Sequence, residues 1–300
     1  MNDASQSNAL QTLHHVGITL AADGAQYLDI SGFSPIDATT NPSLVYAAVI
    51  NPEYKHHLEK ALNDAVQNGS GHSMDHQVEL AMDILLLHFA SQILDRVPGR
   101  VSVSIDPRLF LPITSTPFDK PNFDRVLARC LEFNSLARRI LPTDANIPYS
   151  SRLLLKIPAT SLGIAIASVL ENQYSIHTNL TLVFGTVQAV ACAEAGVSVI
   201  SPFVGRVKDF HESRGFVMPT KPDGLPDMVH HPGIQLVRRV KVAFVEKGYI
   251  GKPEIMACGF RSVQELVELC RIGSGGGADL ITVQPELLAE LKNQPPFFKP

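Results

Sequence analysis

The sequence predicts an α/β fold, a single (β/α)8 barrel of the TIM type over residues 1–300. Three observations support this class: short β-rich runs alternate with longer helical patterns, there are eight such runs, and 45% of the 300 residues are hydrophobic. Alternation of this kind is typical of βα units on a parallel sheet. Eight units in a chain of this length favour a closed barrel over an open sheet or two ordinary domains.

The expected elements follow from this alternation. The eight strands are predicted at 15–20, 33–38, 100–105, 153–157, 175–182, 197–201, 254–258 and 279–283. Helical patterns occupy 53–67, 75–95, 122–140, 162–171, 186–195, 233–247 and 263–271. Residues 1–12 are expected to form a tail or an extra helix. The segment 210–232, with several Pro and Gly, is expected to be a long loop, either a mobile cover over a site or a plain insertion.

Composition argues against several classes of function. The formal net charge of −4 gives no cationic footprint for nucleic acid, and no apolar run approaches the roughly 20 residues of a membrane span. Residues 1–10 are polar and lack the positively charged and apolar regions that make up a signal peptide. The four cysteines have no Cys-x-x-Cys spacing, so we expect reduced thiols and a cytoplasmic protein.

One lysine, Lys156, lies inside the apolar run 153–157. A buried ammonium group is either paired or loses its proton. A neutral lysine amine attacks carbonyl carbon, which is the first step of Schiff-base chemistry. The alternative is that Lys156 marks a strand end and extends its ammonium group into solvent. The run alone leaves both interpretations open.

Polar side chains collect at the predicted carboxyl ends of the strands. In a barrel of this kind these ends share the face that carries the active site. The residues concerned are Asp23, Asn41, Ser104, Asp106, Lys156, Thr181, Ser201 and Arg261. An amine nucleophile, a carboxylate for proton transfer and cations for an anion on one face indicate an enzyme.

Two short motifs add detail. Residues 201–206 read Ser-Pro-Phe-Val-Gly-Arg, and a strand-end hydroxyl with an arginine fork suits a phosphate group, to which Arg261 would add a second cation. The alternative is a turn with a surface arginine. Residues 37–44 read Asp-Ala-Thr-Thr-Asn-Pro-Ser-Leu, where Asn41 and Pro42 are typical of a helix start. A helix start alone does not account for the residues before Asn41.

Five stretches of the chain resemble the transaldolase family, and the resemblance extends over nearly the whole length. They are 37–43, 155–157, 179–182, 191–197 and 200–206. The resemblance implies a (β/α)8 barrel that moves a dihydroxyacetone unit from a ketose phosphate to an aldose phosphate, with no cofactor and no metal. It implies sugar-phosphate substrates and, because the family is often dimeric, a homodimer.

The resemblance also implies roles for individual residues. Lys156 would be the Schiff-base lysine, Asp23 the general acid/base, and Thr181 the residue that positions a catalytic water. The residues that would bind substrate are Asn41 and Asn179 for hydroxyl groups, Ser201, Arg206 and Arg261 for the phosphate, and Phe203 as an aromatic beside the site.

At Ser104 the chain departs from the family, which carries a glutamate there beside a proton-relaying water. A serine hydroxyl does not accept a proton at neutral pH as a carboxylate does, and loss of one positioned acid/base costs about 10²–10⁴-fold in rate. Asp106 lies on the same strand face but matches a family aspartate of its own. Three hypotheses follow: a transaldolase-like transferase, an aldolase or specialised-metabolism carbon–carbon bond enzyme with an altered proton relay at Ser104, and a non-catalytic sugar-phosphate-binding homologue.

Overall fold

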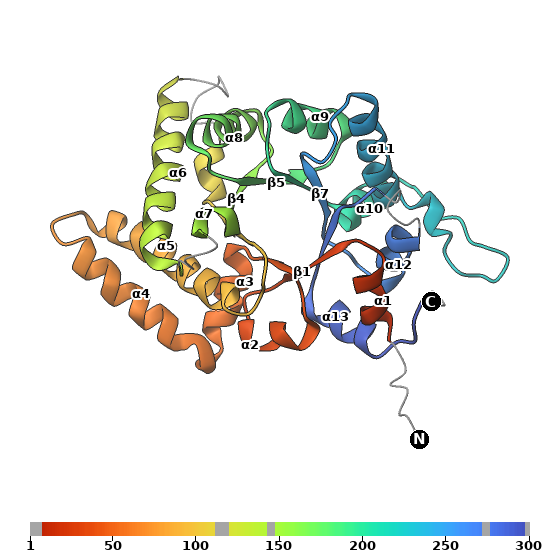
Figure 1. The fold of residues 1–300 in the computed structure, drawn as a ribbon, viewed down its shortest axis with the longest axis horizontal. Coiled ribbons are helices and arrows are strands. Elements are labelled where there is room, and N and C mark those ends of the chain that lie inside the picture. Colours follow the sequence, from red (N-terminus) through yellow and green to blue (C-terminus); the bar gives the residue numbers. More distant parts are fainter. Residues whose placement is uncertain (1–7, 112–119, 143–147, 272–276, 298–300) are drawn as a thin grey trace. The chain divides into compact units, whose positions relative to one another are not determined.

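The computed structural model describes residues 8–111, 120–142, 148–271 and 277–297. In this part of the chain, strands hydrogen-bond to their neighbours in the order β1 to β8 and close into a barrel (Figure 1). This confirms the predicted (β/α)8 class. The strands are β1 Thr19–Asp23, β2 Asp37–Thr39, β3 Val101–Ser104, β4 Leu153–Pro158, β5 Thr178–Val183, β6 Val199–Pro202, β7 Glu254–Ala257 and β8 Leu280–Val283.

Helices connect and flank these strands. They are α1 Ala9–His15, α2 Tyr27–Ile30, α3 Pro42–Ile50, α4 Lys55–Asn68, α5 Met74–Leu94, α6 Lys120–Ile140, α7 Tyr149–Arg152, α8 Ser161–Tyr174, α9 Thr186–Glu194, α10 Val204–Glu212, α11 Pro232–Glu246, α12 Val263–Arg271 and α13 Pro285–Lys292. Short 3₁₀ turns are found at Ser31–Phe33, Pro52–Tyr54, Pro107–Phe110 and Met228–His230.

The chain divides into two compact units. The first comprises residues 1–22 and 179–300, and the second comprises residues 23–178. The first unit therefore holds β6 to β8 with α9 to α13, and the second holds β2 to β4 with α2 to α8. The expectation of one domain over residues 1–300 stays a prediction.

In the second unit, β3 and β4 run parallel with Ser104 opposite Lys156. The long helix α5 contacts α4, α6 and β3, and its inner residues include the fully buried Leu87 and Phe89. By length and composition alone α5 could cross a membrane, although Asp75, Glu79 and Asp83 interrupt its apolar residues. This is weak evidence for a membrane span, because helices that pack in a protein core meet the same criterion.

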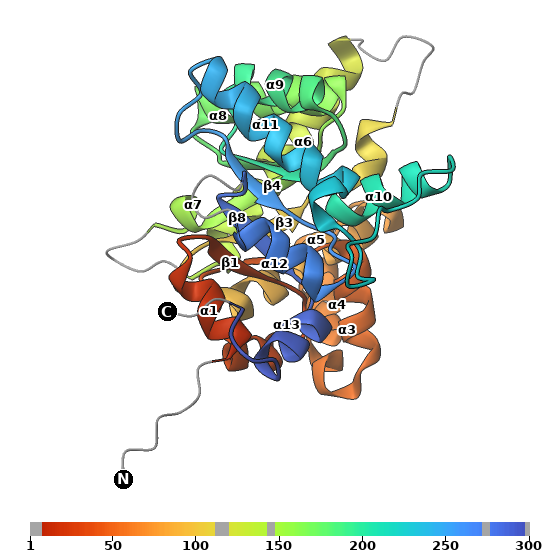
Figure 2. The same cartoon turned by 90° about the vertical axis from the view of Figure 1, so that its right-hand side faces the viewer.

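In the first unit, α11 lies beside α9 and α10 (Figure 2). The segment after α10 forms a protruding loop that is closed by a backbone bridge between Thr220 and Pro226. The helix α1 contacts α13. It begins at a capping box in which Asn8 accepts a hydrogen bond from the backbone of Gln11.

Carboxylates at the amino ends of strands are used for structure. Asp37, the first residue of β2, is buried and accepts hydrogen bonds from the backbone N–H and the Nε of Arg100, at 2.7 and 3.0 Å. In the first unit, Asp279 accepts from the backbone N–H of Ile255 at 2.9 Å and from Lys241 Nζ at 2.6 Å. Removing one partner of such a partly buried pair leaves an uncompensated charge, so these residues contribute to stability.

Several predicted elements are corrected by the structure. The strand predicted at 15–20 begins only at Thr19, because the capped helix α1 continues to His15 and Gly17, with φ of 76°, turns the chain. The helices α10 and α13 were not expected as helices, and of α3 one interpretation of the motif at 37–44 predicts the start. The predicted loop 210–232 is shorter than expected, since its first three residues belong to α10 and Pro232 begins α11.

Candidate active site

Four residues of the second unit form what we call the lysine group: the candidates Asp23, Ser104 and Lys156, together with Thr39, which contacts Asp23. Lys156 is the one partly exposed residue of β4, whose other five residues are buried. A strand that is buried on both faces reads as a continuous apolar run, and Lys156 interrupts it. Lys156 Nζ lies 3.5 Å from the backbone oxygen of Thr40, the longest distance that counts as a hydrogen bond. Within the described residues the amine has no carboxylate partner.

Asp23 is the last residue of β1 and is half-buried. The hydroxyl of Thr39, the last residue of β2, donates to Asp23 Oδ1 at 2.8 Å. This hydrogen bond fixes one carboxylate oxygen and leaves the other available for proton transfer. Sequence reasoning did not assign a role to Thr39, although it lies in the motif at 37–43.

Ser104 ends β3, is 8% exposed, and stands opposite Lys156 in the register of the two strands. Its hydroxyl makes no hydrogen bond to the described protein. Asp106 does not replace a carboxylate here, since both of its oxygens accept hydrogen bonds from Arg108. Burial tends to raise the pKa of Asp106, but the hydrogen bonds and charge of Arg108 outweigh it and lower that pKa.

Asn41 is the N-cap of α3, as one interpretation of its motif predicts. Its Oδ1 accepts a hydrogen bond from the backbone N–H of Leu44 at 3.0 Å, and Pro42 occupies the first helical position. Capping occupies the side-chain oxygen and leaves the two amide N–H donors for other partners. The preceding Thr40 is fully buried, and its hydroxyl makes no hydrogen bond to the described residues.

Four of the candidate residues of the first unit form what we call the arginine group: Asn179, Ser201, Arg206 and Arg261. Asn179 on β5 and Ser201 on β6 are both buried. Ser201 Oγ donates to Asn179 Oδ1 at 2.7 Å, so the two predicted substrate-binding residues orient each other. Asn179 Nδ2 donates a weak hydrogen bond to the thioether sulfur, Sδ, of Met256 at 3.8 Å.

The two arginines are held differently. Arg206 is in the first turn of α10, is exposed, and lies 5.9 Å from the ring centre of Phe203. Arg261 Nη2 donates to Asp209 Oδ2 at 2.8 Å, and the aliphatic part of the Arg261 side chain packs against Gly205. A Cβ at position 205 would lie 2.8 Å from Arg261 Cγ, so a glycine is needed there. Asp209 was not predicted, because only the fold brings it to Arg261.

Thr181 lies in β5, and its hydroxyl oxygen is buried without a hydrogen-bond partner in the described chain. Buried hydroxyls are usually satisfied by protein or by ordered water. The residue is therefore suited to hold a water molecule, as the resemblance implies. The structure places Thr181 two residues after Asn179 on the same strand.

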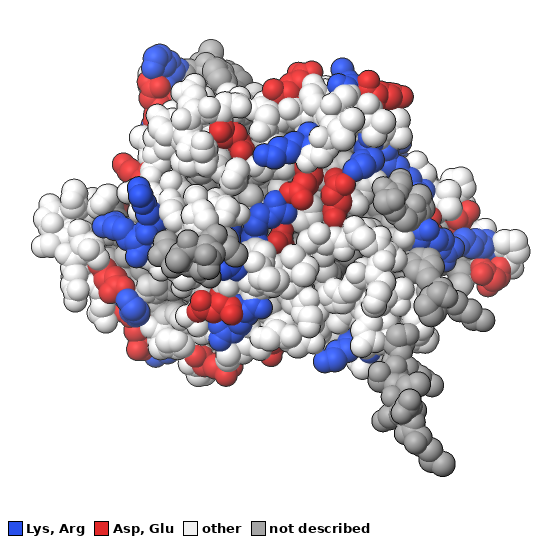
Figure 3. Space-filling model, in the orientation of Figure 1, with Lys and Arg blue, Asp and Glu red and all other residues white. Residues whose placement is uncertain are grey.

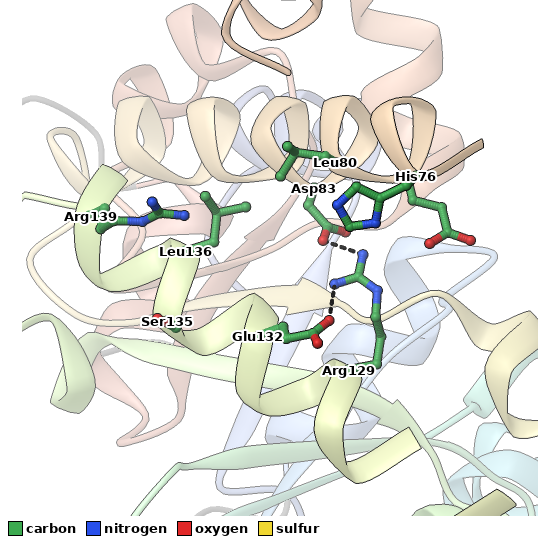
Figure 4. A pocket seen from close by; sticks show the side chains of 9 residues that line it. His76, Leu80, Asp83, Arg129, Glu132, Ser135, Leu136 and Arg139 are labelled. Atoms are coloured by element: carbon green, nitrogen blue, oxygen red, sulfur yellow. Dashed lines mark hydrogen bonds and ion pairs between the residues drawn. The ribbon is translucent and has the colours of Figure 1, made fainter. Parts of the chain in front are cut away.

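The hollow between α5 and α6 is separate from the predicted residues (Figure 4). It has a volume of about 270 Å³ and is lined by side chains that include Asp83, Arg129 and Glu132. Asp83 forms an ion pair with Arg129, yet burial raises the pKa of Asp83 to about 6. The pair ties two helices together, and none of the predicted site residues lines this hollow.

Other chemistries find little support. Burial raises the pKa of the thiols of Cys130, Cys192 and Cys270 to about 12, which makes them poor nucleophiles. A search of the described residues finds no cluster of histidine, cysteine and carboxylate ligands that could hold a metal ion. On the face shown in Figure 3, the coloured basic and acidic residues are interspersed rather than gathered into a cationic field.

Comparison with known proteins matches the chain to a family. The chain matches the family model "Transaldolase/Fructose-6-phosphate aldolase" over residues 20–297. A transaldolase from Kluyveromyces lactis is 38% identical over 288 residues, which cover 95% of this chain and 75% of that protein. A probable transaldolase from Dictyostelium discoideum is 37% identical over 287 residues, covering 96% and 79%. A transaldolase from Nostoc sp. is 38% identical over 286 residues, covering 95% and 76%. The chain belongs to the transaldolase/fructose-6-phosphate aldolase family.

Proposed function

We propose that the protein is a transaldolase-type transferase that carries a dihydroxyacetone unit from a ketose phosphate to an aldose phosphate on Lys156. The observation that supports this most directly is the state of Lys156. It is a lysine in an otherwise buried strand, and within the described residues its Nζ contacts a carbonyl oxygen, that of Thr40, and no carboxylate. Because no ion pair among these residues holds the amine, its nitrogen is available to a substrate carbonyl carbon, as nucleophilic attack requires.

The proposed reaction begins when Lys156 Nζ attacks the ketone carbon of the donor. Loss of water from the adduct gives an iminium ion. Asp23 then accepts the proton of the hydroxyl group next to the breaking carbon–carbon bond, the aldose phosphate leaves, and the bond electrons pass into an enamine. The enamine adds to the aldehyde carbon of the acceptor, Asp23 returns the proton, and water releases the new ketose phosphate. Thr39 supports this step because its hydrogen bond orients the carboxylate.

The arginine group supports a phosphorylated substrate. Arg206 is exposed in the first turn of α10, where the helix dipole also favours an anion. Arg261 would add charge if it exchanges Asp209 for a phosphate oxygen, since it is exposed and paired only through Nη2. Asn41 retains its amide donors for a substrate hydroxyl, since its Oδ1 caps α3. Asn179 would bind a second hydroxyl. Phe203 would pack beside the bound substrate.

Ser104 would set the rate rather than the type of reaction. Position 104, opposite Lys156, carries a hydroxyl in place of a carboxylate. The carboxylate of Asp106 accepts hydrogen bonds from Arg108 and so does not take over this role. Water must therefore carry protons during imine formation and breakdown without an adjacent carboxylate. We expect slower turnover than in a variant that carries glutamate at this position.

A turnover assay tests the proposal. Fructose 6-phosphate as donor and an aldose phosphate as acceptor are incubated with the protein, and the new ketose phosphate is measured by mass spectrometry. The proposal predicts transfer that depends on both substrates. Binding of the sugar phosphates, seen as thermal stabilisation, without any transfer would indicate a sugar-phosphate-binding homologue instead. Release of free dihydroxyacetone without an acceptor would indicate an aldolase.

We also propose a cytoplasmic location. All four cysteines are buried as free thiols, which suits a reducing compartment. Imaging of the full chain with a fluorescent tag in cells would test this, and enrichment in a secretory compartment would contradict it.

A further inference from the structure

The backbone next to Thr181 is unusual. Leu182 has a φ of 64°, in the left-handed region where the Cβ of an L-residue meets the following carbonyl oxygen. Among the described residues, two other non-glycine residues have a positive φ, Ser34 and Ser175, and each directly follows a helix. Left-handed residues are common at helix ends. Leu182 instead lies within a strand, so something must hold it there.

The unusual residue belongs to a β-bulge. Leu180 pairs with Ile200 and Val183 pairs with Pro202, so that Thr181 and Leu182 together stand opposite Ser201. Bulges bend a strand and redirect a side chain, and they are common next to active sites. The Thr181 hydroxyl oxygen at this bulge is buried without a protein partner. Its direction is therefore set by the backbone and not by a hydrogen bond of its own.

One side chain binds the backbone on the carboxyl-terminal side of the bulge. The backbone N–H of Phe184 donates to Gln188 Oε1 at 2.9 Å, and Gln188 Nε2 donates to the backbone oxygen of Leu182 at 3.0 Å. The amide of Gln188 thus spans the peptide groups on either side of Val183. Only a side chain with both a donor and an acceptor makes this pair of contacts.

We propose that Gln188 is a positioning residue that holds Leu182 in its left-handed conformation and thereby aims the Thr181 hydroxyl at the catalytic water. The inference rests on the proposed function of Thr181. Gln188 acts on the backbone that carries Thr181 and not on a substrate-binding side chain. Its effect is expected in turnover and not in substrate affinity.

A purely structural role must be separated from positioning. Gln188 is the third residue of α9, and its Oε1 accepts from Phe184, the residue before the N-cap Gly185, so the contact also resembles a cap in that it fastens the start of that helix. Gln188→Glu keeps this acceptor but has no donor for the Leu182 oxygen at neutral pH. A cap alone predicts an unchanged Tm and an unchanged kcat for this variant. Positioning predicts an unchanged Tm and a kcat lowered about tenfold, with KM within twofold.

A double-mutant cycle on the full chain tests the link to Thr181. We expect Thr181→Ala to lower kcat about 10²-fold and Gln188→Ala about tenfold. Because both act through one hydroxyl, the double variant should match Thr181→Ala within about twofold. In the Gln188→Ala background, Leu182→Gly should restore most of the lost kcat, since glycine adopts a positive φ without strain. Val187→Ala, at an exposed neighbouring position of α9, is the control and should leave kcat unchanged.

Each outcome decides one of the two claims. Additive losses in the double variant, or a failure of Leu182→Gly to rescue, would overturn the positioning role. Amide hydrogen exchange of Phe184 reports the contact independently of catalysis and should be faster in Gln188→Ala than in the wild type. Unchanged exchange there would overturn the inference even if the wild type proves inactive. Faster exchange with wild-type kcat in Gln188→Ala would refute positioning while the proposed function stands.

Discussion

The lysine group and the arginine group differ in how their polar atoms are satisfied. In the arginine group, Ser201 donates to Asn179 and Arg261 pairs with Asp209. In the lysine group, the described residues offer Lys156 Nζ a distant contact to the Thr40 oxygen and offer the Ser104 hydroxyl no hydrogen bond. Asp23 is the exception, because Thr39 holds one of its oxygens.

The difference suggests a division of labour between the two groups. Side chains that bind a substrate profit from being held in place beforehand, since less entropy is lost on binding. A nucleophile must instead keep its lone pair free, and a proton carrier needs one unoccupied oxygen. Substitutions in the lysine group should therefore change kcat, while those in the arginine group should change KM.

The largest effect is expected at Lys156. Lys156→Arg keeps a cation of similar length but cannot form an imine, so transfer should fall about 10⁴-fold or more. Initial rates of ketose phosphate formation measure this. Lys55→Arg, at an exposed lysine of α4, is the matched control and should retain full activity. Substantial transfer by Lys156→Arg would exclude the lysine group as the catalytic centre.

The next effect is expected at Ser104. Ser104→Glu places a carboxylate opposite Lys156, which should raise kcat about tenfold or more by relaying protons through water. Ser104→Gln has the same size without the charge and should give no gain. Steady-state rates with the same donor and acceptor compare the three proteins. Equal rates for all three would show that proton relay at this position does not limit turnover.

A smaller effect is expected in the arginine group. Arg206→Ala should raise KM for the phosphorylated donor about 10- to 10²-fold and change kcat little. A loss of this size corresponds to one or two charge-assisted hydrogen bonds to the phosphate. Arg214→Ala is the control, since Arg214 stacks on Phe210 outside the group. A loss confined to kcat would contradict the division between the two groups.

The fold could be predicted where local pattern and burial agree. The strands β3 and β4 lie within one residue of their predicted positions, because each is an apolar run with clear boundaries. The prediction failed for β1, where a capping box extended α1. It also missed α10, because the motif at 201–206 indicates a phosphate-binding segment or a turn and residues 210–232 are predicted to be a loop.

The candidate site could be predicted only as a list of residues. Lys156 was found from its place in a buried run and from the family resemblance. The contacts between Thr39 and Asp23, and between Asp209 and Arg261, join positions 16 and 52 residues apart. The left-handed Leu182 gives no sequence signal, because leucine is ordinarily disfavoured in that conformation.

The smallest effect concerns pH and separates stability from chemistry. His57 is buried beside Tyr27, and burial together with His56 and His88 lowers the pKa of His57 to about 4. Between about pH 6.5 and pH 4 the unfolded chain binds this proton and the folded chain does not, so acidification should lower the free energy of unfolding. His57→Gln should flatten that slope in urea unfolding experiments. Exposed His14→Gln should leave it unchanged, and an equal slope in all three proteins would exclude His57 as the cause.

Borohydride trapping tests the central claim most directly. The full-length protein is incubated with fructose 6-phosphate, reduced with sodium borohydride, and digested for mass spectrometry. The account predicts a stable adduct with the mass of a reduced dihydroxyacetone or ketose phosphate imine on Lys156 and on no other lysine, and none in Lys156→Arg. No adduct, or an adduct on a different lysine that persists in Lys156→Arg, would contradict it.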